Sequence, residues 1–174
     1  MTTDPFIPNT DELVSLNEAY AAQFEDRHLQ VAPTRRLAVV ACMDSRMDIF
    51  AILGLDNGEA HIIRNAGGVI TDDVIRSLCL SQRLLGTREI VLVHHTDCGL
   101  QRVSEDAFKA ELEAELGIKP WWSLEAFTDA YADVRQSIQR LYRSPFIAHS
   151  QHVRGFVYDV ADGLLHEVQA TEAP

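Results

Sequence analysis

Two unbroken apolar runs constrain the fold of this chain more than any other feature of its sequence. Residues 36–42 read RLAVVAC and residues 89–95 read EIVLVHH. Neither run alternates between apolar and polar residues, as a strand with one face in water would. Continuous apolar runs of this length are typical of strands that are covered on both faces, as in a parallel sheet. We therefore expect both runs to lie inside such a sheet.

A helix is predicted between the two runs. Residues 71–86, TDDVIRSLCLSQRLLG, begin with a threonine that can cap a helix, carry two acids in the first turn and end with a glycine. The preceding segment AHIIRNAGG, residues 60–68, predicts a short strand that leads into a glycine turn. Cys79 lies among leucines in the middle of this helix, and we expect it in the core.

Two further helices and a hairpin are predicted in the second half of the chain. One helix covers about 104–116, and a longer one begins near Ser123 and carries an apolar stripe as far as Leu141. The segment VRGFVYDVADGLLHEV, residues 153–168, predicts a strand, an Asp-Gly turn and a return strand. The alternation of strands and helices predicts the α/β class, with a mainly parallel β-sheet flanked by helices and an antiparallel edge strand.

Composition limits the partners and the compartment. The 174 residues suit a single domain, 1–174, and a net charge of −11 would repel nucleic acid and anionic lipid. No apolar stretch reaches the length of a membrane span, and the first residues lack the pattern of a signal peptide. Three cysteines are an odd number and do not resemble a disulfide framework, so we expect a reducing, cytoplasmic compartment.

Three residues that can bind a metal lie at or just after the ends of the two apolar runs. Cys42 ends the first run, His95 ends the second, and Cys98 lies three residues further on. If the two runs form neighbouring parallel strands, these side chains converge at the carboxyl edge of the sheet, where sites form in such folds. Two thiolates and an imidazole suit Zn²⁺, and three protein ligands leave a fourth position open, as catalytic zinc sites do.

Other interpretations of these residues are weaker. Cys42 and Cys98 could be buried thiols that act as small hydrophobic side chains. A thiol phosphatase would need an arginine six residues after its cysteine, where this chain has Asp48. His94 is expected on the opposite strand face from His95, and Asp97 is expected either to orient a ligand or to cap the turn.

The segments CMDSR, HIIRNAGG and HHTDCG resemble the β-class carbonic anhydrases, in particular the short microbial branch that also includes carbonyl sulfide and carbon disulfide hydrolases. The resemblance implies one zinc ion per chain on Cys42, His95 and Cys98, and a catalytic dyad formed by Asp44 and Arg46. It also implies a homodimer or homotetramer, in which an N-terminal helical arm, residues 1–30, packs on a partner subunit. The arm carries the apolar stripe Leu13, Leu16, Tyr20 and Phe24.

The implied activity is the reversible hydration of carbon dioxide to bicarbonate and a proton by a zinc-bound hydroxide. Zinc lowers the pKa of its bound water, as it does in the three-histidine carbonic anhydrases. Asp44 would orient this hydroxide and Arg46 would hold Asp44; alternatively, Asp44 would become a fourth zinc ligand and close the site. The same zinc would also suit the hydrolysis of carbonyl sulfide to H₂S and CO₂, and a non-catalytic zinc or redox-sensing protein is a third reading.

Overall fold

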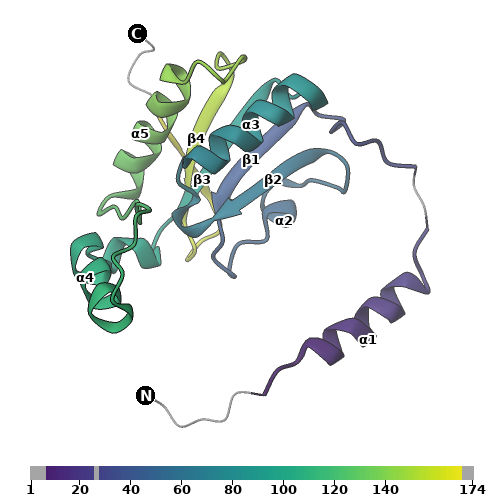
Figure 1. Ribbon diagram of the computed structural model, residues 1–174. Helices are drawn as coiled ribbons and strands as arrows, with labels where there is room; N and C mark the ends of the chain where they lie inside the picture. Colours follow the sequence, from purple (N-terminus) through teal and green to yellow (C-terminus); the bar gives the residue numbers. More distant parts are fainter. Residues whose placement is uncertain (1–6, 26–27, 170–174) are drawn as a thin grey trace.

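A five-stranded sheet in the order β2-β1-β3-β4-β5 forms the centre of the computed structural model, which describes residues 7–25 and 28–169. Parallel pairing joins β2 to β1, β1 to β3 and β3 to β4, and antiparallel pairing joins β4 to β5 at the edge. The predicted mainly parallel sheet with an antiparallel edge strand is confirmed (Figure 1). The strands are β1 Leu37–Cys42, β2 Ala60–Asn65, β3 Glu89–His95, β4 Val153–Tyr158 and β5 Leu165–Val168.

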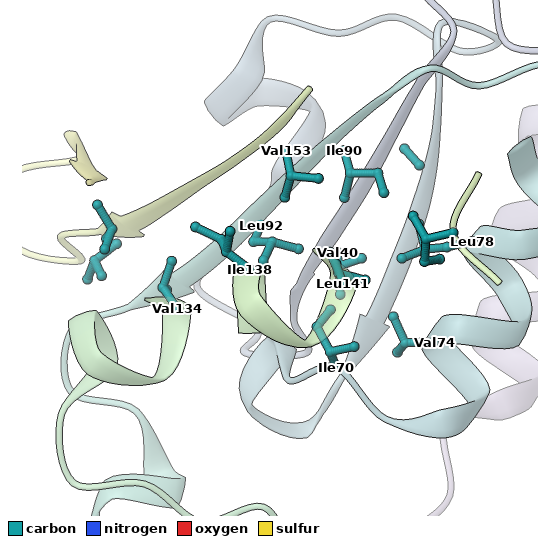
Figure 2. Close-up of a cluster of buried hydrophobic side chains, with 14 of the residues drawn as sticks. Val40, Ile70, Val74, Leu78, Ile90, Leu92, Val134, Ile138, Leu141 and Val153 are labelled. Carbon is teal, nitrogen blue, oxygen red and sulfur yellow. The ribbon is translucent and has the colours of Figure 1, made fainter. Parts of the chain in front are cut away.

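The apolar runs are buried on both faces, as expected. All six residues of β1 are buried, and from Leu37 to Ala41 they alternate between two apolar clusters on opposite faces of the sheet. Helices α3 (Asp72–Leu85) and α5 (Ala130–Arg143) cover one face. Figure 2 shows this cluster, in which side chains of both helices pack on Val40, Ile90 and Leu92 of the central strands. The sheet is therefore a rigid base, and its carboxyl edge remains available for a site.

The two helices that cover this face begin at side-chain caps. The Thr71 hydroxyl accepts a hydrogen bond from the Val74 amide, as predicted for α3. The predicted start of α5 near Ser123 is wrong. The Asp129 carboxylate accepts hydrogen bonds from the amides of Tyr131 and Ala132, at 2.8 and 3.2 Å, and begins the helix at Ala130. Residues 121–129 form an irregular segment, in which Phe127 packs against the core while Trp121 and Trp122 are exposed.

The remaining helices are shorter or lie at the margin of the sheet. Helix α4, Glu105–Leu116, forms where it was predicted, whereas the five-residue helix α2, Ile49–Leu53, was not predicted. Two 3₁₀ turns, η1 Ala66–Gly68 and η2 Gly99–Arg102, follow β2 and Cys98. Cys79 is only partly buried and lines a groove between α3 and α5, so its predicted place in the core is wrong.

Helix α1, Thr10–Ala21, extends away from the rest of the structure (Figure 1). None of its side chains is buried against the other described residues, and the apolar side chains of Leu13, Leu16 and Tyr20 are more than half exposed. Asn9 precedes the helix but its side chain forms no capping hydrogen bond with described residues. No helix in the described ranges is both long enough and apolar enough to cross a membrane.

Candidate metal centre

Cys42, His95 and Cys98 come together at the carboxyl edge of the sheet. β1 and β3 are parallel neighbours with Ala41 opposite Val93, so both strands end at the same edge. The two sulfur atoms and a ring nitrogen of His95 all lie within 4.8 Å of one another, and all three residues are buried. The strand pairing thus brings together side chains that are more than fifty positions apart in the sequence.

The turn after β2 fits tightly against the ends of both strands. Gly68 has a φ of +72°, and a Cβ added there would lie 2.8 Å from the Cys42 amide nitrogen and 3.2 Å from the Val93 carbonyl oxygen. Arg64, at the end of β2, donates hydrogen bonds to the carbonyl oxygens of Cys42 and Asp44, at 2.9 and 2.7 Å. These contacts fix the backbone that carries the first sulfur atom.

The two sulfur atoms interact strongly with each other. The hydrogen bond from Cys98 is the largest cause that lowers the pKa of Cys42 to about 4, and interactions with His95 and with the backbone of Asp44 and Gly67 lower it further against the effect of burial. The same interaction with Cys42, together with burial, raises the pKa of Cys98. The interaction between the two sulfur atoms thus favours a thiolate at Cys42 and a thiol at Cys98.

His95 presents one nitrogen to the cluster. Its Nδ1 lies 2.8 Å from the Thr96 carbonyl oxygen, which can only accept, so Nδ1 carries a proton and, in the neutral ring, Nε2 keeps the lone pair. Nε2 is buried and has no hydrogen-bond partner within residues 7–25 and 28–169. Burial by itself would lower the pKa of His95, but the neighbouring Cys42 sulfur and its charge raise it on balance.

The donor set fits a divalent metal ion of borderline softness. A ring nitrogen that is buried without a partner is costly unless something binds it, and metal-ligating histidines commonly donate their other N–H to a backbone carbonyl, as His95 does here. A cation would also favour loss of the Cys98 proton, because it stabilises both thiolates. Cys42, His95 and Cys98 therefore have the chemistry of a three-ligand zinc site.

Asp44 and Arg46 lie beside this cluster as a bidentate ion pair. Arg46 donates from Nε to Asp44 Oδ1 at 2.9 Å and from Nη2 to Oδ2 at 2.8 Å, and its backbone amide also donates to Oδ1 at 2.9 Å. The hydrogen bonds from Arg46 are the main cause that lowers the pKa of Asp44, so the carboxylate is ionised. Asp44 Oδ2 also lies 3.6 Å from the free Nε2 of His95 and thus faces the cluster.

Some residues near the site were not identified from sequence. Arg64 was missed, because its contact with the Cys42 backbone depends on the pairing of β2 with β1, which the sequence did not indicate. His94 lies on the opposite face of β3, as expected, where its Nε2 is 2.7 Å from Asp133 of α5 and its ring makes a tilted contact with Phe127. Asp97 makes contacts with both Arg46 and Arg102.

Comparisons with known proteins point to one family. The profile of the carbonic anhydrase family matches residues 37–165. β-Carbonic anhydrase 1 of Mycobacterium tuberculosis is 53% identical over 91% of this chain and 97% of that protein. A carbon disulfide hydrolase of Acidithiobacillus thiooxidans is 31% identical over 87% of this chain and 90% of that protein. A crystal structure of carbonic anhydrase from Streptococcus mutans superposes with a TM-score of 0.87, at 42% identity, over 95% of this chain and 100% of that chain.

Replacement of Gly68 tests the tight approach of the turn to Cys42. Gly68→Ala and Gly86→Ala both place a side chain at a positive φ, which costs about 1–2 kcal/mol. An added Cβ at Gly86 meets nothing within 4 Å, whereas at Gly68 it overlaps the β1 backbone and should cost about 1–3 kcal/mol more. Urea unfolding of both variants measures the difference. Equal losses of stability would show that the turn does not press against β1.

Proposed function

The chain belongs to the β-carbonic anhydrase family, and from that premise we propose that its reaction, the reversible hydration of carbon dioxide to bicarbonate and a proton, takes place at a zinc ion held by Cys42, His95 and Cys98. The observation that carries this proposal is the buried, convergent Cys-His-Cys cluster at the carboxyl edge of the sheet. Bound there, zinc would act as a Lewis acid that makes water a nucleophile near neutral pH.

Asp44 supplies orientation in this proposal. Its ionised carboxylate can only accept hydrogen bonds, so it would accept one from the attacking water and turn a lone pair of that oxygen toward the carbon of the substrate. Arg46 occupies both oxygens of Asp44 and would act as a positioning residue. The ion pair between Asp44 and Arg46 favours the open alternative, because Asp44 would have to leave Arg46 to become a fourth ligand.

The surroundings of the cluster suit an uncharged substrate. Cys42 and Cys98 belong to an apolar cluster that includes Met47 and Ile49, and Leu100 and Phe127 pack against it. Carbon dioxide is small and apolar, so an apolar environment would admit it while excluding bulk water. Bicarbonate is an anion, and the nearby guanidinium of Arg46 would attract it toward the exposed side of the site as it leaves.

Zinc content tests the ligand set. We expect about one zinc per chain in the wild-type protein and loss of most of it in Cys98→Ala after dialysis against a chelator, because two ligands hold the ion far less firmly than three. Cys79→Ala is the matched control, since Cys79 lies in the groove between α3 and α5. Elemental analysis gives the result, and full retention of zinc by Cys98→Ala would remove Cys98 from the ligand set.

A parallel assay separates the substrates. We expect zinc-verified protein to hydrate carbon dioxide faster than it hydrolyses carbonyl sulfide, since 53% identity to a carbonic anhydrase outweighs 31% identity to a carbon disulfide hydrolase. Faster release of H₂S from carbonyl sulfide would favour the hydrolase alternative, and a zinc-loaded protein inactive on both substrates would favour the non-catalytic hypothesis.

Asp44→Asn should lower the hydration rate by about 10–100-fold with zinc retained, because the amide binds Arg46 weakly.

The exposed stripe of α1 supports a homodimer or homotetramer. The side chains of Leu13, Leu16 and Tyr20 are 54–59% exposed within one chain, and a second copy would cover them. Light scattering at micromolar concentration should give at least twice the mass of one chain. Leu16→Glu should shift the protein toward the monomer, while Ser15→Glu on the opposite side of the helix should not. A wild-type monomer with full activity would contradict the oligomer.

A further inference from the structure

Asp97 lies in the short connection between two members of the cluster, His95 and Cys98. Its backbone has a φ of +56°, a left-handed conformation that aspartate and asparagine adopt more readily than most residues. Its carboxylate accepts a hydrogen bond from Arg46 Nη1 through Oδ2, at 3.1 Å, and its Oδ1 forms an ion pair with Arg102. Its backbone carbonyl also accepts from Arg46 Nη2, at 3.1 Å.

Arg46 is thus bound on two sides. On one side Nε and Nη2 donate to Asp44, and on the other Nη1 and Nη2 donate to Asp97. A guanidinium is planar and has five N–H donors, and four hydrogen bonds in two directions leave Arg46 little freedom to rotate. The loop after β1 and the loop after β3 are joined through this one side chain.

We propose that Asp97, itself held by Arg102, is a positioning residue for the hydration reaction, because it fixes Arg46 and through Arg46 the carboxylate of Asp44. The inference rests on the proposed function. The charges of Asp44, Arg46, Asp97 and Arg102 alternate in sign along the chain of contacts, so each group is held by groups of opposite charge. Without the carboxylate of Asp97, Nη1 of Arg46 would lose its acceptor and could bind the bicarbonate product instead.

The contribution of Asp97 is to orientation and not to folding stability. The side chains of Arg46 and Asp97 are 45% and 47% exposed, and exposed ion pairs contribute little to the free energy of unfolding. Its carboxylate lies between two guanidinium groups, those of Arg46 and Arg102, and balances their charge. A change that removes this charge should therefore affect the rate and leave the fold intact.

Asp97→Asn removes the charge and keeps a side chain that tolerates the left-handed backbone. We expect it to lower kcat for hydration about tenfold with little change in KM, as substitution of a partner of a site residue commonly does. Zinc content and the thermal midpoint should match the wild type. Arg102→Gln should have a smaller effect in the same direction, because Asp97 keeps its contact with Arg46. Asp73→Asn, which breaks the exposed pair with Arg76 on α3, is the matched control and should leave kcat unchanged.

A double-mutant cycle with Arg46→Lys separates this role from a structural one. If Asp97 acts through Arg46, Asp97→Asn should lower kcat in the wild type and have little further effect in Arg46→Lys. An equal loss in both backgrounds, loss of zinc from Asp97→Asn, or unchanged kcat would each overturn the inference. A zinc-loaded wild type without hydratase activity would overturn the proposed function and this inference together, whereas an active wild type with an equally active Asp97→Asn overturns the inference alone.

Discussion

β1 and β3 lie side by side in parallel, and this pairing determines where every residue of the candidate site is found. With Ala41 opposite Val93, the two strands end within a residue of each other, and the residues after their ends must share the same edge. Both strands are covered on each face by apolar side chains, so the pairing cannot slip without exposing the core. The positions of Cys42 and His95 are therefore fixed by the packing of apolar side chains along the length of β1 and β3.

The Cys-His-Cys cluster places several polar and titratable groups in the protein interior. Two thiols and an imidazole nitrogen are buried together, and the nitrogen lacks a partner among the described residues. Such a group is costly in a folded protein unless a ligand satisfies it. The backbone amides near Cys42 and the carbonyl that accepts from His95 Nδ1 already favour the protonation states that a cation needs. The thiol of Cys42 and the neutral ring of His95 thus have protonation preferences that suit metal ligation.

Sequence patterns identified the buried strands and the helix between the first two apolar runs. The two runs were predicted as strands because burial on both faces makes a strand continuously apolar, and the helix was predicted because capping residues mark its two ends. The start of α5 was misplaced because Phe127 continues the apolar spacing of the helix, although Asp129 caps it two residues later. The contacts of Arg64 and Asp97 could not be read from sequence, because a long side chain can reach several neighbours and its direction depends on the tertiary structure.

Burial divides the site into a fixed part and an exposed part. The proposed zinc ligands are buried at strand ends, where packing sets their distances, whereas Arg46, Asp97 and Arg102 are partly in water. A substrate that enters from solution and an anionic product that leaves both need an exposed side, so the orienting residues cannot all be buried. In water a single ion pair would be too weak to hold Asp44 in one direction. Side chains of alternating charge on two loops can hold Asp44 in one orientation, because each further ion pair restricts the rotation of the side chain before it.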